Sequence, residues 1–127
     1  IYTHMSPTLL DGVTREMRLW REESFGPVKA IIRVHSEEEA LAVANDSEYG
    51  LSAAVYSRDS ARAWNVAQRL HTGICHINGP TVHDEAQMPF GGCKASGYGR
   101  FGGRAGIAEF TELRWITIQT QPRELPF

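Results

Sequence analysis

The sequence is poor in cysteine and contains no long apolar run, and each shortage excludes a class of protein. Cysteine occurs twice, at Cys75 and Cys93, too rarely for the disulfide framework of a small secreted domain. We therefore expect a reducing, cytoplasmic compartment. Because no apolar run approaches the roughly 20 residues that a membrane-spanning helix needs, we also expect no membrane partner.

The chain also has no large excess of charge of either sign. The chain has 13 basic and 15 acidic side chains, whereas nucleic-acid binding calls for a concentrated basic excess, so no nucleic-acid partner is expected. The start, Ile1 to His4, has no basic or apolar region of a secretory signal. It also lacks an initiator methionine, and we expect a piece of a longer chain. The 127 residues suit one domain with a core.

The apolar pattern predicts alternating strands and helices. Ser36 and Glu39 form a capping box before a helical apolar face, and Asp59 can cap a second helix that stops at Gly73. The expected elements are a short strand around Leu9 to Val13, a strand from Val28 to Val34, a helix from Glu37 to Asn45, a strand from Leu51 to Ser57, a helix from Asp59 to Gly73, and a strand from Ile74 to Asn78.

This order predicts an α/β fold, part of a doubly wound sheet with parallel strands. Ligands of such sheets bind outside the carboxyl ends of the strands. The longest segment to leave those ends runs from Asn78 to Phe90 and leads into a glycine-rich stretch. We therefore expect an active cleft built from residues 78–106.

A helix from Arg104 to Glu112 and an alternating strand from Leu113 to Thr120 should follow. The terminal strand needs a partner edge, from another part of the protein or another subunit. We therefore divide the chain into residues 1–112 and residues 113–127, the latter a terminal strand and tail.

The stretch from Met88 to Gly106 holds seven glycines in nineteen residues, which indicates backbone that fits closely against something. Within it, Gly97 to Gly102 matches G-x-G-x-x-G, a pattern that can cradle a pyrophosphate. We interpret this match as coincidental. A true fingerprint follows a buried strand, and an acidic residue for the ribose follows about 20 positions later.

Several polar residues could carry chemistry. His83 with Asp84 and Glu85 is either an acid–base pair beside the cleft or a solvated polar loop, and we favour the loop. His71 and His76 lack the further ligands of a zinc site, so no metal is expected.

Cys93 lies beside Lys94, which could activate a nucleophile, but a tolerated small loop residue is the preferred interpretation. Cys75 should be buried and inert. Glu23, just before the strand at Val28, is either a surface charge or a ribose ligand, and alone the surface charge is preferred.

Four ordered motifs resemble one family. They are Glu22-Glu23-Ser24-Phe25-Gly26-Pro27-Val28; Tyr49-Gly50-Leu51-Ser52-Ala53-Ala54-Val55; Gly73 to Asn78; and Pro89-Phe90-Gly91-Gly92 with Lys94, Ser96, Gly97, Gly99 and Arg100. Together they resemble the C-terminal segment of NAD(P)-dependent aldehyde dehydrogenases, over essentially the whole chain. The stretches Asn78 to Glu85 and Gly99 to Gly103 are most similar to the salicylaldehyde and vanillin type, which acts on aromatic aldehydes.

The resemblance implies that residues 1–112 are a C-terminal portion of the aldehyde dehydrogenase catalytic domain and that residues 113–127 are an oligomerisation strand and tail. It also implies a role for several residues. Glu23, Phe25 and Leu51 would bind the nicotinamide end of NAD, with NADP possible. In the substrate tunnel, Phe90 would be an aromatic wall, and Thr81 to Asp84, including His83, would shape the mouth. Arg100 and Glu112 would form a polar pair near a subunit interface of a homodimer or tetramer, and Ile116 to Thr120 would join a neighbour's sheet.

The resemblance also implies what is missing. The family's nucleophilic cysteine and general-base glutamate would lie upstream of Ile1, so no catalytic residue is assigned here and the isolated chain should be inactive. Family members attack the aldehyde with a thiolate, transfer hydride to NAD(P)+ and hydrolyse the thioester. Many carry glutamate where this chain has Phe101. The alternative is a non-catalytic module that acts by strand addition through Leu113 to Thr120.

Overall fold

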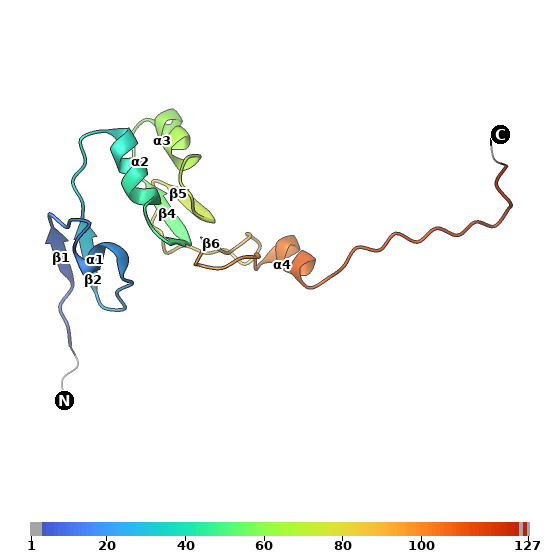
Figure 1. The fold of residues 1–127 in the computed structure, drawn as a ribbon, viewed down its shortest axis with the longest axis horizontal. Helices are drawn as coiled ribbons and strands as arrows, with labels where there is room; N and C mark the ends of the chain where they lie inside the picture. Colours follow the sequence, from blue (N-terminus) through green and yellow to red (C-terminus); the bar gives the residue numbers. More distant parts are fainter. Residues whose placement is uncertain (1–3, 125, 127) are drawn as a thin grey trace.

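The computed structural model describes residues 4–124 and 126, with short helices and strands followed by a long extended arm (Figure 1). The elements are β1 (Thr8–Asp11), α1 (Arg18–Arg21), β2 (Val28–Ile31), α2 (Glu37–Asn45), β3 (Tyr49–Gly50), β4 (Ser52–Val55), α3 (Ser60–Ala67), β5 (Ile74–Ile77), β6 (Cys93–Lys94) and α4 (Gly103–Glu109).

The centre of the fold is a βαβ unit. β4 and β5 pair in parallel from Ser52↔Ile74 to Val55↔Ile77, and α3 is the crossover helix that packs on both strands. Asp59 caps α3, because its carboxylate accepts a hydrogen bond of 3.0 Å from the Arg62 backbone N–H. The expected strand, helix and strand are therefore confirmed here, with shorter bounds.

α2 begins and ends where the sequence predicts. Ser36 Oγ accepts from the Glu39 N–H at 3.1 Å, and the Glu39 carboxylate accepts from the His35 N–H at 2.7 Å, so a capping box starts the helix. Leu41 is buried on its inner face. Arg62 of α3 pairs with Glu37 at 2.6 Å and links the two helices at the surface.

The strand expected from Val28 to Val34 does not join the central sheet, and this part of the topology prediction was wrong. β2 pairs instead in parallel with β1, from Thr8↔Val28 to Asp11↔Ile31. The apolar pattern marked a strand correctly but did not specify its partner, because neighbouring edges offer the same backbone groups. Figure 1 shows β1, β2 and α1 as a separate group beside α2.

α1 was not expected, because its four residues show no apolar period. Hydrogen bonds and an ion pair of its side chains stabilise α1 instead. Arg18 forms a two-point ion pair with Glu22, at 2.8 and 2.6 Å, and this pairing lowers the pKa of Glu22. The Trp20 indole donates to Asp46 at the end of α2 over 3.3 Å.

The glycine-rich stretch turns back onto the central unit through short pairings. β6 is antiparallel to β3, with Gly50↔Cys93 in register. The Lys94 ammonium donates to the carbonyls of Asn45 and Ser47, at 3.1 and 3.0 Å. Phe90 and Phe101 exchange two backbone hydrogen bonds of 2.8 and 2.7 Å. The stretch is thus a folded corner of the molecule.

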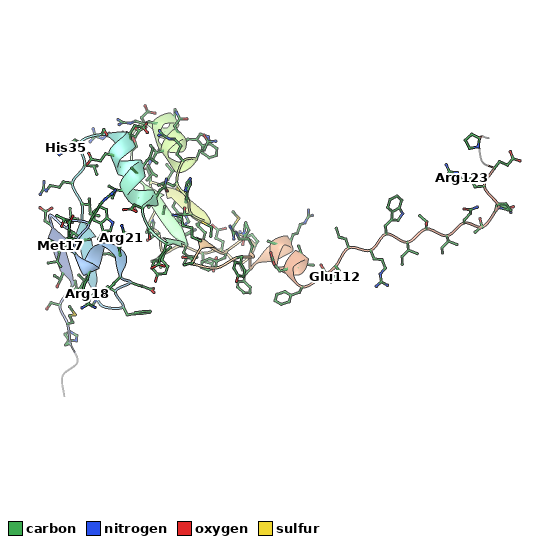
Figure 2. All side chains as sticks on the ribbon, in the orientation of Figure 1. Met17, Arg18, Arg21, His35, Glu112 and Arg123 are labelled. Carbon is green, nitrogen blue, oxygen red and sulfur yellow. The ribbon has the colours of Figure 1, made fainter. Side chains whose placement is uncertain are left out.

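The arm from Glu112 onward is extended, and its described residues are exposed. Leu113 is 104% exposed and Trp115 is 91% exposed, and side chains along the arm between Glu112 and Arg123 point into open space (Figure 2). No strand forms within residues 113–124, so a terminal strand that pairs with another subunit stays a prediction. The expected outer domain limits, Ile1 and Phe127, lie outside the described residues.

The described chain buries little. Val13, Leu41 and Ala63 are its buried apolar residues, and the accessible surface is 11131 Å², whereas a compact monomer of this mass exposes about 6,800 Å². Much apolar surface is therefore open to a covering partner. Among the residues that the structure describes, no helix is long and apolar enough to cross a membrane.

Candidate functional site

The carboxyl ends of β4 and β5 are fastened together by Asn78. Its side-chain Oδ1 accepts from the Ser57 N–H at 2.9 Å, and its Nδ2 donates to the Ser57 carbonyl at 3.0 Å. Its φ of 57° is left-handed, a conformation that asparagine tolerates better than most residues. The sequence analysis placed Asn78 at a strand end but missed this role, for which an asparagine after an apolar strand is the available signal.

Glu23 and Leu51 line one groove, of about 550 Å³. They lie 28 positions apart in the sequence, so the fold brings two of the three predicted cofactor residues together. Glu22 also lines the groove but is tied to Arg18, whereas Glu23 has no side-chain hydrogen bond among the described residues. The other lining residues are Trp20, Arg21, Ala44, Ser47, Tyr49, Gly50, Ser52, Ala53, Leu70, Thr72 and Ser96.

The groove offers groups that can contact a sugar and a flat ring. A free carboxylate can accept hydrogen bonds from sugar hydroxyls, and Leu51 with Ala53 offers apolar surface to a flat ring. Phe25, the third predicted cofactor residue, is 95% exposed and lines no part of this groove. The chain thus brings Glu23 and Leu51 together and leaves Phe25 apart.

A second cavity, of about 350 Å³, lies between β5 and the segment that follows it. His83 and Phe90, two of the three predicted substrate residues, line it. The remaining lining residues are Gly73, Ile74, Cys75, His76, Asp84, Glu85, Met88 and Pro89. Part of the expected segment, residues 83–90, therefore lines a cavity. This cavity lies along β5 from Gly73 to His76, and not outside the carboxyl end of the strand as expected.

In this cavity His83 pairs with Glu85, not with the neighbouring Asp84. His83 Nε2 lies 3.3 Å from Glu85 Oε1, and the His76 and His83 rings meet edge to face with centroids 5.6 Å apart. Nε2 of His76 is buried without a hydrogen-bond partner in the described structure. His83 and Glu85 are about half exposed, at 54% and 50%, so the preferred interpretation of this segment as a solvated polar loop is confirmed.

Thr81, the third predicted substrate residue, does not line the cavity. Its backbone carbonyl accepts a hydrogen bond of 3.1 Å from Ser52 Oγ. Thr81 therefore anchors the cavity segment to β4 through its backbone.

Several glycines allow close approach of backbone to backbone. A Cβ on Gly73 would lie 1.9 Å from the Gly91 carbonyl oxygen, and one on Gly102, at φ 86°, would lie 2.2 Å from the Met88 oxygen. The Gly97 to Gly102 motif follows a two-residue strand and opens a seven-residue helix outside the βαβ unit. That context differs from a dinucleotide fingerprint.

Neither cysteine is placed as a nucleophile. Cys93 Sγ donates to the carbonyls of Gly50 and His71, at 3.4 and 3.3 Å, while the neighbouring Lys94 is engaged with other carbonyls. Burial raises the pKa of the Cys75 thiol, which keeps it protonated and unreactive. The described residues contain no group of ligands suited to a metal ion.

Arg100 and Glu112 do not pair within the described chain. The Arg100 guanidinium donates to the backbone carbonyls of Gly92 and Gly99, both at 2.7 Å, and so closes the glycine-rich corner. Glu112 lies at the base of the exposed arm (Figure 2). An interface role for both residues stays a prediction.

Comparisons of the sequence with known proteins agree on one family. The model of the aldehyde dehydrogenase family matches residues 3–116. A vanillin dehydrogenase of Pseudomonas sp. strain HR199 is 67% identical over 122 residues, which are 96% of this chain and 25% of the relative. A salicylaldehyde dehydrogenase of Pseudomonas putida is 51% identical over 97% of this chain and 26% of its own length.

Solved structures agree with this. A salicylaldehyde dehydrogenase from Pseudomonas putida G7, complexed with salicylaldehyde, superposes with a TM-score of 0.87 and 52% identity over 94% of this chain and 25% of its own. A Mycobacterium tuberculosis aldehyde dehydrogenase complexed with NAD+ gives 0.78 and 42%, over 84% and 22%. A Streptococcus pyogenes succinic semialdehyde dehydrogenase with NADP+ gives 0.85 and 40%, over 90% and 25%.

The chain spans about a quarter of the length of these relatives. Its α/β elements follow the aldehyde dehydrogenase structures over nearly all of that quarter, as the resemblance of its four motifs predicted. On the family match and the structural agreement together, the chain belongs to the aldehyde dehydrogenase family.

Proposed function

We propose that this chain is the C-terminal quarter of an enzyme that oxidises aromatic aldehydes to carboxylic acids with NAD+ or NADP+. The observation that carries the proposal is the 67% identity to a vanillin dehydrogenase over nearly the whole chain. The salicylaldehyde dehydrogenase relatives support the aromatic substrate class. The two neighbours solved with NAD+ and with NADP+ support the cofactor class.

In this proposal the groove of Glu23 and Leu51 holds the nicotinamide riboside end of the cofactor, which supplies a hydride acceptor when bound. The Glu23 carboxylate would accept hydrogen bonds from the ribose hydroxyls, and Leu51 would pack on the ring. Phe25 would approach the ring only when the remainder of the protein covers it, since it is free of other contacts in the isolated chain.

The cavity of His83 and Phe90 would receive the aromatic aldehyde. Phe90 offers a face for ring stacking, and Thr81 holds the segment in place through its carbonyl. The nucleophile and the general base would come from the remainder of the protein. The isolated chain would therefore bind and orient without turning over, and its partners would be that remainder and further copies in a homodimer or tetramer.

We also propose a cytoplasmic location, which the two unpaired cysteines support. Phe101 stands where the resemblance implies a glutamate in many members, so a relay for thioester hydrolysis would use another group or water.

An activity assay tests the proposal. The isolated chain and the longer protein that contains it are each given NAD+ or NADP+ with vanillin, salicylaldehyde or benzaldehyde, and reduced cofactor is followed by absorbance. We expect turnover in the longer protein alone. Activity of the isolated chain would show that a nucleophile lies within it, and an inactive longer protein would contradict the assigned reaction.

A second candidate is a non-catalytic module that acts by strand addition. The exposed apolar side chains of the arm, among them Trp115 and Ile118, favour it. Sedimentation of the chain with and without its last fourteen residues tests this function. A monomer in both cases would argue against it, whereas loss of an oligomer on truncation would support it.

A further inference from the structure

Asp46 connects two parts of the described chain through polar contacts. One part is the N-terminal group, residues 4–34, in which β1, α1 and β2 lie beside α2 (Figure 1). Within the described residues, every hydrogen bond or ion pair between this group and the chain that follows it is made with the Asp46 carboxylate. One side chain therefore carries the polar connection between the two parts.

Three nitrogen atoms of the N-terminal group converge on one oxygen of that carboxylate. The Trp20 indole donates to Asp46 Oδ2 over 3.3 Å. Guanidinium nitrogens of Arg15 and Arg21 lie 3.5 and 3.7 Å from the same oxygen. The Arg15 guanidinium also lies over the Trp20 ring, 5.6 Å from its centroid. Because the Asp46 side chain is only 29% exposed, solvent screens these contacts less than it screens a fully exposed pair.

A carboxylate at the position of Asp46 does not favour α2 itself. Asp46 is the C-terminal cap of this helix, and its backbone N–H donates to the carbonyls of Ala42 and Val43, at 3.0 and 3.2 Å. The helix macrodipole places partial negative charge at this end, where an anionic side chain is unfavourable. The arginines of the N-terminal group offset this cost. The carboxylate is thus suited to a contact between elements and not to ending the helix.

The same contacts connect two segments that line the groove of Glu23. One segment is residues 20–23, at the end of α1, and most of the other lining residues lie between positions 44 and 53. Trp20 lines the groove and also donates to Asp46, whereas Asp46 lines no part of it. Asp46 therefore holds one segment against the other from outside the groove.

The end of α2 is itself fixed in place. The Lys94 ammonium donates to the carbonyls of Asn45 and Ser47, on either side of Asp46, at 3.1 and 3.0 Å. Glu23 lies two residues after the end of α1. The position of its carboxylate therefore follows that of α1, which Asp46 connects to the fixed end of α2.

We propose that Asp46 is a positioning residue for the cofactor. By holding α1 against the end of α2, it sets where the Glu23 carboxylate meets the hydroxyls of the nicotinamide ribose. Asp46 touches neither the cofactor nor the aldehyde, and it acts through Trp20 and the two arginines. This role rests on the proposed function, because it needs a nicotinamide cofactor in the groove.

Cofactor binding by the longer protein tests the role. The dissociation constant of NADH or NADPH, whichever binds more tightly, is measured by fluorescence titration. We expect Asp46→Ala to weaken this binding about three- to tenfold, as fits the loss of the contacts that hold α1. Binding of ADP or 2′-phospho-ADP, which lack the nicotinamide ribose, should stay unchanged. Unchanged affinity for the reduced cofactor, or equal losses for both ligands, would overturn the proposal.

Two further variants separate the role from a general loss of stability. Asp46→Asn should bind the reduced cofactor more tightly than Asp46→Ala, because its amide oxygen still accepts from Trp20. The matched control is Asp11→Ala, which removes an ion pair with Arg33 inside the N-terminal group and lines no part of the groove. It should leave cofactor affinity unchanged. Equal losses in Asp11→Ala and Asp46→Ala would contradict the positioning role.

A double-mutant cycle tests whether Asp46 acts through Glu23. In a Glu23→Ala background, Asp46→Ala should change the affinity for the reduced cofactor by no more than about twofold, because the group that it positions is gone. A full additional loss would overturn the proposed route.

Turnover separates this role from the proposed reaction. If the variants show the expected binding but the longer protein oxidises no aromatic aldehyde, the proposed reaction fails and the positioning role stands. Turnover with equal cofactor affinity in the wild type and Asp46→Ala refutes the positioning role alone. A wild type that binds neither reduced cofactor refutes both.

Discussion

Asn78 combines a left-handed backbone with a side chain that bridges two strand ends. Replacement by glycine removes the two hydrogen bonds to Ser57 but still allows the left-handed backbone conformation. Replacement by alanine removes the same hydrogen bonds and also disfavours that conformation. We expect Asn78→Ala to destabilise the longer protein by about 1 kcal/mol more than Asn78→Gly. Thermal unfolding of the two variants measures the difference. Equal midpoints would show that the backbone conformation carries no cost.

The two cysteines should differ in reactivity. Burial raises the pKa of Cys75, so near pH 7 its thiolate fraction lies below that of an ordinary cysteine. A pKa that folding raises adds stability at pH values below the unfolded thiol's pKa, and this stability is lost as the pH rises through the folded value.

We therefore expect alkylation of Cys75 in the longer protein to be slower than that of an unfolded peptide with the same sequence, and to accelerate as the solution becomes more alkaline. Mass-spectrometric peptide mapping after timed exposure to iodoacetamide measures both rates. Labelling of Cys75 at the peptide's rate at neutral pH would contradict its protected state.

Among the candidate residues, sequence reasoning succeeded where neighbours along the chain define the environment. It placed Cys75 correctly in a strand and excluded the Gly97 to Gly102 motif by its context. It could not pair His83 with Glu85 in place of Asp84, since that choice depends on how the backbone turns between them. Nor could it foresee the edge-to-face contact of His76 with His83, which requires the tertiary fold.

At the scale of elements, local sequence signals correctly predicted where α2 and α3 begin. A side-chain cap begins each helix, and caps are encoded within four residues. β3 and β6 were missed because two-residue strands show no alternation, and their pairing joins positions more than forty residues apart. The sequence identified strands near β1 and β2 but not their pairing, which depends on the tertiary fold.

The close backbone contacts of the glycine-rich corner predict how one added methyl group changes stability. Gly73→Ala would place its Cβ 1.9 Å from a backbone oxygen of Gly91, which cannot move aside without opening the corner. We expect destabilisation by about 1–3 kcal/mol.

The matched control is Gly106→Ala, inside α4, where the nearest atom to a Cβ lies at 3.8 Å. It should stabilise by about 0.5–1 kcal/mol through helix propensity. Denaturant or thermal unfolding of the longer protein compares both variants. A neutral Gly73→Ala would mean that the two segments separate freely.

At the scale of the whole molecule, the exposed area is the main finding. The chain exposes 11131 Å², about 1.6 times what a compact monomer of its mass would expose. We expect the isolated chain to unfold without a cooperative transition, because too little apolar surface is buried to offset the entropy of ordering.

Differential scanning calorimetry and near-ultraviolet circular dichroism test this expectation. A shortened chain that lacks residues 113–127 is the control, and it should behave alike, since every described residue of the arm is exposed. One sharp heat-absorption peak from the isolated chain would contradict the expectation.

Residues of β4 line the groove, residues of β5 line the cavity, and the two strands are hydrogen-bonded neighbours. Gly50 and Leu51 line the groove, Gly73 and Ile74 line the cavity, and the hydrogen bonds from Gly73 N to Gly50 O and from Ile74 N to Leu51 O are both 3.0 Å long. The spacing between these two strand walls is therefore set by the register in which β4 and β5 pair. It can change only when one strand slips along the other, in steps of about 3.3 Å that would also turn every side chain of the slipped strand to the opposite face.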